Sequence, residues 1–149
     1  MNKVLLIIPA YNEEENIVRV IDNIIQNFPQ LDYVVINDGS KDHTPDLCRE
    51  HHYNMVDLPI NLGLAGAFRT GMKYALYHGY EYAIQYDGDG QHNPEYIEQM
   101  AAMAETENLD IVIGSRFVTE KKPRSLRMLG STLLTFCIRI TTGKRINDP

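Results

Sequence analysis

Two carboxylates lie two residues apart in the segment Asp87-Gly88-Asp89-Gly90-Gln91, directly after an apolar stretch. On a glycine-flexible turn, both carboxylates can face one point. Hard divalent cations prefer oxygen ligands, and a protein that supplies only one or two of them leaves positions for substrate phosphate oxygens. The spacing therefore indicates a Mg²⁺ or Mn²⁺ site that bridges a diphosphate. A solvated acidic turn is the alternative that the two residues alone leave open.

A calcium-binding EF-hand loop is a sharper competitor for the same segment. The twelve residues from Asp87 to Glu98 carry oxygen ligands at the required positions. However, the position that needs glycine holds His92, and Pro94 lies two residues later. The preceding residues 80–86 also have a strand pattern, where an EF-hand requires a helix. We therefore favour the diphosphate site over the EF-hand.

Short apolar runs alternate with helical repeats along the whole chain, which places these carboxylates in a recognisable frame. We expect strands over residues 3–9, 31–37, 53–58, 81–86 and 109–114. Amphipathic spacing predicts helices over 13–27, from 44, over 64–76, 93–105 and 126–140. Asn12 with Glu15 has the spacing of a capping box, and Thr44 with Pro45 is typical of a helix start.

This alternation predicts an α/β fold, a three-layer α/β/α sandwich with a mainly parallel central sheet, in one domain over residues 1–149. Ligands of such folds bind beyond the carboxyl ends of the strands. The loops expected there, at residues 9–12, 37–41, 59–63, 87–93 and 115–117, hold most of the unusual residues. The helix from Leu64 also carries small residues at positions such as Gly66 and Gly71, which suit close packing or a nearby ligand.

Charge is distributed unevenly along the 149 residues, whose net charge is −6. Residues 1–115 carry 18 acidic and 6 basic residues, whereas residues 116–145 carry 8 basic residues and one acidic residue. The cationic segment suits phosphates or an anionic membrane surface, and a solvated basic face is the alternative. Cys48 and Cys137 are expected to be reduced, and no apolar run is long enough to span a membrane. We expect a protein of the cytoplasm or of the cytoplasmic face of the membrane, with no nucleic-acid partner.

Five motifs, in order, each follow an expected strand, and together they resemble the family 2 glycosyltransferases with the GT-A fold. The similarity is greatest to the polyprenyl-phosphate (dolichyl-phosphate) mannosyl- and glucosyltransferases. The motifs are Ile8-Pro9-Ala10-Tyr11-Asn12-Glu13, residues 35–42 around Asp38-Gly39-Ser40, Asn61-Leu62-Gly63 with Ala67, Gly71 and Ala75, residues 87–95, and Gly114-Ser115-Arg116.

The resemblance implies a role for each matching position. The nucleotide would be bound by Pro9, Ala10, Tyr11, Glu13, Asp38, Gly63 and Asp87. Asp89, with Gln91, would hold a Mg²⁺ or Mn²⁺ ion, and Arg116 would neutralise phosphate. Arg127 and Ser131 match a pair that contacts the acceptor phosphate, with a helix-surface pair as the alternative. Asp148 is a weak candidate for a catalytic base.

The resemblance also implies a reaction. A hexose would pass from a UDP- or GDP-sugar to an acceptor with inversion, most favourably to polyprenyl phosphate, in cell-envelope glycan biosynthesis. A hydroxyl (glycan) acceptor, a non-catalytic nucleotide-sugar-binding fragment and a calcium-binding module are the alternatives. Members of the family continue beyond the equivalent of Pro149, so we expect the domain to be incomplete at its C-terminal end. We also expect a homo-oligomer as a possible assembly.

Overall fold

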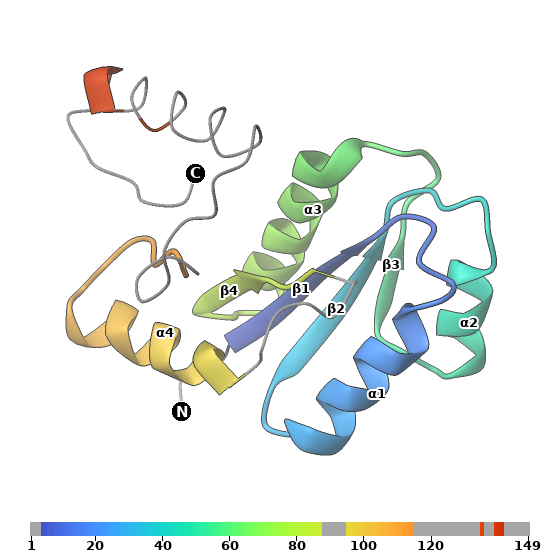
Figure 1. Cartoon of the computed structure of the whole chain (residues 1–149), viewed down its shortest axis with the longest axis horizontal. Helices are drawn as coiled ribbons and strands as arrows, with labels where there is room; N and C mark the ends of the chain where they lie inside the picture. The colour runs from blue at the N-terminus through green and yellow to red at the C-terminus, as the bar shows by residue number, and fades with distance from the viewer. Residues whose placement is uncertain (1–3, 88–94, 115–134, 136–138, 142–149) are drawn as a thin grey trace, which may run out of the picture.

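Four parallel strands form the centre of the protein in this computed structural model, which describes residues 4–87, 95–114, 135 and 139–141 (Figure 1). The strands are β1 (Val4–Ala10), β2 (Asp32–Asn37), β3 (Met55–Asp57) and β4 (Tyr82–Gln85). They lie in the order β3-β2-β1-β4, and every neighbouring pair is parallel. The carboxyl ends of all four strands therefore lie at one edge of the sheet.

Helices cover both faces of this sheet, as the expected sandwich requires. They are α1 (Ile17–Asn27), α2 (Thr44–Glu50), α3 (Gly63–Tyr77) and α4 (Glu95–Thr106). Alternate residues of β1 point to opposite faces. Leu6 and Ile8 join a core cluster with residues of α1, α2 and α4, whereas Leu5 and Ile7 join a second cluster with residues of α3. In the described part of the chain, α3 alone covers its face of the sheet (Figure 1).

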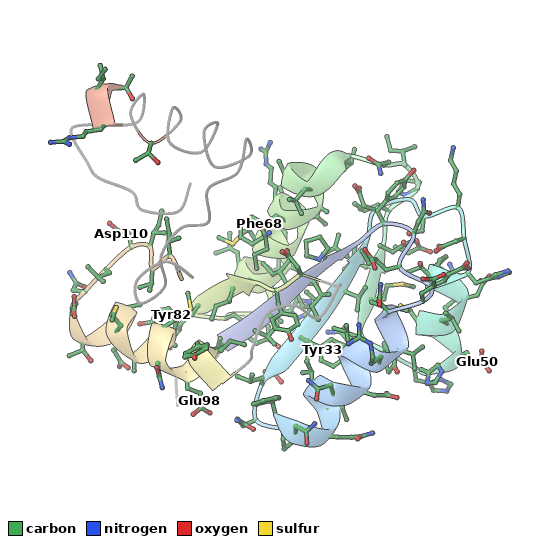
Figure 2. The ribbon with its side chains drawn as sticks, viewed as in Figure 1. Tyr33, Glu50, Phe68, Tyr82, Glu98 and Asp110 are labelled. Carbon is green, nitrogen blue, oxygen red and sulfur yellow. The ribbon has the colours of Figure 1, made fainter. Side chains whose placement is uncertain are left out.

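The two faces are filled by side chains of different size. On α1, the buried residues are Ile17, Val20, Ile21 and Ile24. On α3, they are Ala67, Gly71 and Ala75. A Cβ atom added at Gly71 would lie 2.2 Å from Cγ2 of Ile7, so α3 approaches the sheet as closely as its backbone allows. The small residues of this helix therefore allow it to pack closely on the sheet. The partly buried Phe68 (labelled in Figure 2) packs beside them.

The expected fifth strand is wrong for the described residues. Residues 110–114 form no strand, and the side chains of Ile111 and Ile113 are exposed. An apolar run becomes a strand only where a neighbour satisfies its backbone hydrogen bonds, and within the described part of the sheet β4 pairs with β1 alone. The third strand is shorter than expected, and the helix expected over 126–140 lies mostly outside the described residues.

Cys48 is a free, buried thiol, as the sequence predicted. Burial raises its pKa to about 11, so the thiol is protonated at neutral pH. Cys137 lies outside the described residues. None of the helices in the described residues is long and apolar enough to cross a membrane.

Candidate functional site

The loops that follow β1, β2 and β3 begin side by side at the carboxyl edge of the sheet. The backbone N–H of Asp38 donates to the carbonyl of Ala10 at 2.8 Å, and the N–H of Leu58 donates to the carbonyl of Asn37 at 2.9 Å. These two bonds extend the parallel pairing one residue past the strands. The first three of the expected ligand-binding loops therefore lie together, as the sequence predicted.

The loop after β1 is joined to the loop after β2 by hydrogen bonds in both directions. The N–H of Asn12 donates to Oγ of Ser40 at 3.0 Å, and Oδ1 of Asn12 accepts from the N–H of Lys41 at 2.9 Å. The N–H of Glu13 donates to Oγ1 of Thr44 at 2.8 Å. We call the contacts between residues 12–14 and residues 40–44 the loop clamp.

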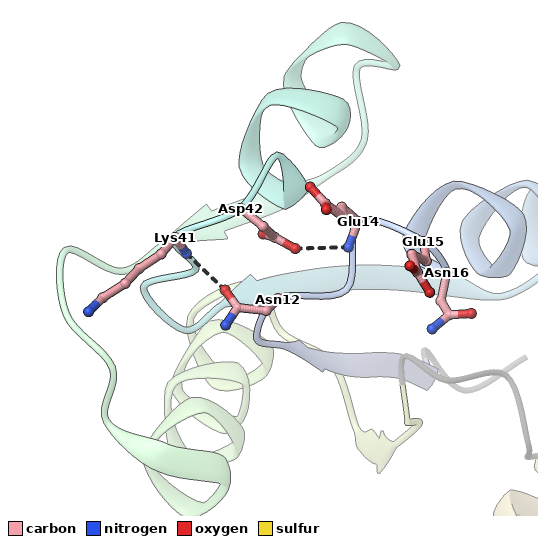
Figure 3. A pocket seen from close by; sticks show the side chains of 6 residues that line it. All are labelled: Asn12, Glu14, Glu15, Asn16, Lys41 and Asp42. Carbon is pink, nitrogen blue, oxygen red and sulfur yellow. Dashed lines mark hydrogen bonds between the residues drawn. The ribbon is translucent and has the colours of Figure 1, made fainter.

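The loop clamp is completed by two acidic side chains that accept from backbone N–H groups. Oδ2 of Asp42 accepts from the N–H of Glu14 at 3.1 Å (Figure 3). Oε2 of Glu14 accepts from the N–H of His43 at 3.0 Å. Burial of Asp42 alone would raise its pKa, but the donors from Thr44 and Glu14 outweigh this effect and lower it. Asp42 is therefore held in its charged form by the loops that it joins.

The structure corrects one predicted helix start and confirms another. Asn12 has a φ of 57°, whereas an N-cap residue adopts the β region, so Asn12 and Glu15 form no capping box. Side chains of the second loop accept from the N–H groups of Glu13 and Glu14, and α1 begins at Ile17, with Asn16 as its N-cap. α2 begins at Thr44, as predicted, although its N-cap is His43, and the Thr44 hydroxyl accepts from the N–H of Glu13.

Asp38 holds the third loop. Its side chain is buried, and Oδ1 accepts from the N–H of Leu62 at 2.7 Å. Beside it, Gly39 has a φ of 66°, and a Cβ atom there would lie 2.6 Å from the backbone of Ile60 and Asn61. The loop after β2 thus lies directly against the loop that leads into α3, and no larger residue fits at position 39.

Asn37, at the end of β2, forms a second set of polar contacts at the same edge of the sheet. Asn37 is buried, its Nδ2 donates to Oδ1 of Asp57 at 2.6 Å, and its Oδ1 accepts from the N–H of Ser40 at 3.4 Å. Arg49 of α2 forms an ion pair with the other carboxylate oxygen of Asp57. These contacts fix the ends of β2 and β3 relative to α2.

The residues predicted to bind nucleotide differ in how far they can reach a ligand. Tyr11 is exposed at the tip of the first loop, whereas Ala10 is buried and Pro9 is half-buried. Oε2 of Glu13 accepts from Nδ2 of Asn16 at 3.0 Å. Gly63 begins α3 with a φ of 75°, a conformation that glycine adopts without strain. Of these residues, Tyr11 presents the largest free surface at the edge.

Asp87 lies at the end of β4, and its Oδ1 accepts from Nε2 of Gln85 at 3.1 Å. The N–H of the preceding residue, Tyr86, donates to the carbonyl of Ile7, so Asp87 enters the same edge one strand away from Tyr11. The side chain of Tyr86 is part of the hydrophobic core. The other predicted site residues, Asp89, Gln91, Arg116, Arg127, Ser131 and Asp148, lie outside the described residues. Within those that are described, no group of three or more His, Cys, Asp or Glu side chains lies close enough together to hold a metal ion.

A hollow on the outer side of the loop clamp is lined by Asn12, Glu14, Glu15, Asn16, Lys41 and Asp42 (Figure 3). Asn12, Glu14 and Asp42 already use side-chain oxygens to hold the two loops together. We therefore regard this hollow as the back of the loop clamp rather than as the donor pocket.

Sequence reasoning missed the residues of the loop clamp. The turn at Asn12 could have been predicted from the sequence. Asparagine is one of the few residues that tolerate a positive φ, and Asn12 lies in the loop after a buried strand. Thr44, Asp42 and Glu14 carried no such signal, since their partners lie about 30 residues away in the chain and the same residue types are typical of ordinary helix starts.

Comparison with known proteins gives the same family that the sequence motifs resemble. The family described as "Glycosyl transferase family 2" matches residues 5–147. The chain is 31% identical to a UDP-N-acetylglucosamine–dolichyl-phosphate N-acetylglucosaminyltransferase of Methanococcus voltae, over 97% of this chain and 65% of that protein. It is 32% identical to an undecaprenyl-phosphate mannosyltransferase of Micrococcus luteus, over 98% of this chain and 63% of that protein.

Among solved structures, the mannosyltransferase PcManGT of Pyrobaculum calidifontis, in complex with GDP-Man and Mn²⁺, is similar with a TM-score of 0.51 and 31% identity. The similarity covers 58% of this chain and 27% of that one. The chain spans less than two-thirds of the length of the curated relatives described above.

Proposed function

Because the chain belongs to glycosyl transferase family 2 and has the GT-A fold, we propose that it is the donor-binding part of an inverting glycosyltransferase. In this proposal, a hexose passes from a UDP- or GDP-sugar to a polyprenyl phosphate. The main support is the joining of the loops after β1, β2 and β3 into one rigid edge, which Asp87 enters from β4.

The described residues divide into those that would contact the donor and those that would hold the loops. Tyr11, exposed at the tip of the first loop, would pack against the nucleotide base. Glu13 and Asp87 would accept hydrogen bonds from the base or ribose. Asp38 is buried and already bonded to Leu62, so we propose that it acts mainly by fixing the third loop against the ligand. A preformed edge of this kind binds a ligand with little loss of conformational entropy.

The diphosphate would be bound by groups beyond β4. Asp89, with Gln91, would hold a divalent cation, because carboxylate and amide oxygens suit Mg²⁺ and Mn²⁺. When bound, such a cation stabilises negative charge on a diphosphate leaving group. Arg116 would add a second positive charge. The mannosyltransferase of P. calidifontis was solved with GDP-Man and Mn²⁺, which supports this donor chemistry.

The acceptor is proposed from chemistry and from the names of the relatives. Two of them act on dolichyl or undecaprenyl phosphate. A lipid phosphate is already anionic, so it attacks the anomeric carbon without a base while the bond to the nucleoside diphosphate breaks on the opposite face. Arg127 and Ser131 would contact that phosphate. A glycan hydroxyl would need a carboxylate base instead, for which Asp148 is the candidate.

The test is a thermal-shift panel of UDP, GDP and their sugars, with and without Mn²⁺. A ligand that binds only the native state raises the melting temperature by mass action. We expect one nucleoside diphosphate to give a metal-dependent shift that Asp89→Ala largely abolishes. Asp110→Ala is the matched control, because this exposed carboxylate (Figure 2) lies away from the loops. An Asp89→Ala protein with an unchanged shift would contradict the metal assignment.

A further inference from the structure

The outer face of α3 exposes large apolar side chains to solvent. The exposed fractions are 45% for Met72, 76% for Leu76 and 84% for Tyr77. These large side chains lie on the solvent side of the helix, whereas Ala67, Gly71 and Ala75 take the sheet side. An amphipathic surface helix normally shows the opposite arrangement, with its large apolar residues toward the core.

Cationic side chains border this apolar face. With 3.6 residues per turn, Met72, Ala65 and Leu76 lie within about 40° of one another around the helix axis. Arg69 and Lys73 occupy about the next 60°. Both bases are exposed, and neither forms an ion pair with any of the described residues. We call the set formed by Met72, Leu76, Arg69 and Lys73 the α3 face.

The sequence around the α3 face lacks acidic residues. From Leu58 to Tyr80 there is no Asp or Glu, although the whole chain has 20 of them and a net charge of −6. Glu14, Glu15 and Asp42, in contrast, line the hollow of the loop clamp, in the loops that lead into α1 and α2. The α3 face is thus an apolar and cationic surface on an acidic protein, and its charge is complementary to an anionic partner.

We propose that the α3 face docks on an anionic lipid bilayer, with α3 lying in the plane of the interface. An apolar strip beside Lys and Arg is the pattern of interfacial helices, which bind by burial of apolar area together with attraction to anionic lipids. The 15 residues of α3 are fewer than the ~20 that a membrane-spanning helix needs, so the helix lies on the membrane. Docking does not depend on the donor site, and it would place the carboxyl edge of the sheet, where α3 begins, beside the bilayer.

The experiment is co-sedimentation of the 149-residue chain with vesicles of mixed phosphatidylglycerol and phosphatidylcholine, or of phosphatidylcholine alone. We expect binding to the anionic vesicles that weakens as salt is added, because screening reduces the attraction. Met72→Glu with Leu76→Glu should lower the partition coefficient at least about tenfold through lost apolar burial. Arg69→Glu with Lys73→Glu should lower it at least about fivefold at low salt.

Matched variants on the opposite side of the sheet separate the α3 face from general charge effects. Ile25→Glu is the control for Met72→Glu, because the two side chains are 46% and 45% exposed and each change adds one negative charge. Arg19→Glu is the control for Arg69→Glu, and both α1 variants should leave vesicle binding unchanged. Circular dichroism and the nucleotide-induced thermal shift confirm that each variant is folded and that the donor site is a separate question. Equal loss of binding in the α1 and α3 variants would overturn the proposal, and so would failure of the unmodified chain to bind anionic vesicles. A dimer in sedimentation velocity that Leu76→Glu abolishes, without any change in vesicle binding, would assign the α3 face to a second copy instead.

Discussion

The two sides of the central sheet are held together in different ways. On the α1 and α2 side, large aliphatic side chains interlock and the loop clamp joins residues 12–14 to residues 40–44 through several hydrogen bonds. On the α3 side, the contact is made by small residues, and the side-chain bond that links the loop into α3 to β2 comes from Asp38. The α1 and α2 side is therefore stabilised by contacts among many side-chain atoms. The α3 side is stabilised by the close approach of a few atoms of small residues to the sheet.

Truncation of an aliphatic side chain should therefore lower the free energy of unfolding on the α1 side and have little effect on the exposed face of α3. Ile24→Ala, in the buried face of α1, should reduce the free energy of unfolding by about 2–5 kcal/mol, because it removes buried methyl groups and leaves a cavity. Leu76→Ala, on the exposed face of α3, should change it by no more than about 0.5 kcal/mol. Urea denaturation of both variants measures the difference, and equal losses would show that the two sides are packed alike.

The sequence predicted the sandwich correctly but could not assign the faces of α3. The repeat of Leu64, Phe68, Met72 and Leu76 indicates a helix, and apolar repeats usually face the core. Only the structure shows that Gly71 meets Ile7 so closely that the small side must face the sheet. The run over 109–114 failed as a strand for a related reason, because strand formation depends on a neighbour that the local sequence does not specify.

Close approach at Gly71 gives the next prediction. A methyl group there would lie 2.2 Å from Cγ2 and 2.9 Å from Cγ1 of Ile7, which is itself fully buried. Gly71→Ala should destabilise the protein by about 1–3 kcal/mol, although alanine favours helices more than glycine does. Ile7→Ala removes the clashing atoms, so the double variant should lose less than the sum of the two single variants in the same denaturation assay. Additive losses would place the strain elsewhere.

The loops should show the same contrast on a smaller scale. Asp38→Ala removes the side-chain acceptor for the N–H of Leu62, at a cost of about 1–3 kcal/mol. Asn12→Gly keeps a residue that tolerates a positive φ and removes one of several bonds in the loop clamp, so it should cost about 0.5–1.5 kcal/mol. Thermal unfolding ranks the two. Asp38→Asn, which keeps an acceptor oxygen, is the control that should recover part of the loss.

The edge of the sheet that holds the described part of the candidate site was predictable, because its position follows from the parallel direction of the strands. Parallel strands bring their carboxyl ends to one edge, so Tyr11, Asp38 and Asp87 could be placed together from the sequence. How each residue acts was not predictable in the same way. Whether the carboxylate of Asp38 is free or bonded to Leu62 depends on a loop 24 residues away. The local sequence pattern does not indicate contacts between residues so far apart in the chain.

The pH dependence of the loop clamp gives the smallest effect. The pKa of Asp42 is lowered in the folded protein, where donors from Thr44 and Glu14 outweigh the opposing effect of burial. An unfolded aspartate titrates near about 3.9, so this group contributes stability above that pH, and the contribution is lost as the pH falls through the lower folded-state pKa. Asp42→Asn should therefore be less stable than the unmodified protein at neutral pH, and the difference should narrow in urea titrations below about pH 4. Because this carboxylate is only half-buried, water partly screens its interactions and the difference should be modest. A gap that stays constant from neutral to acidic pH would mean that the asparagine weakens the loop clamp through its shape and not through the lost charge.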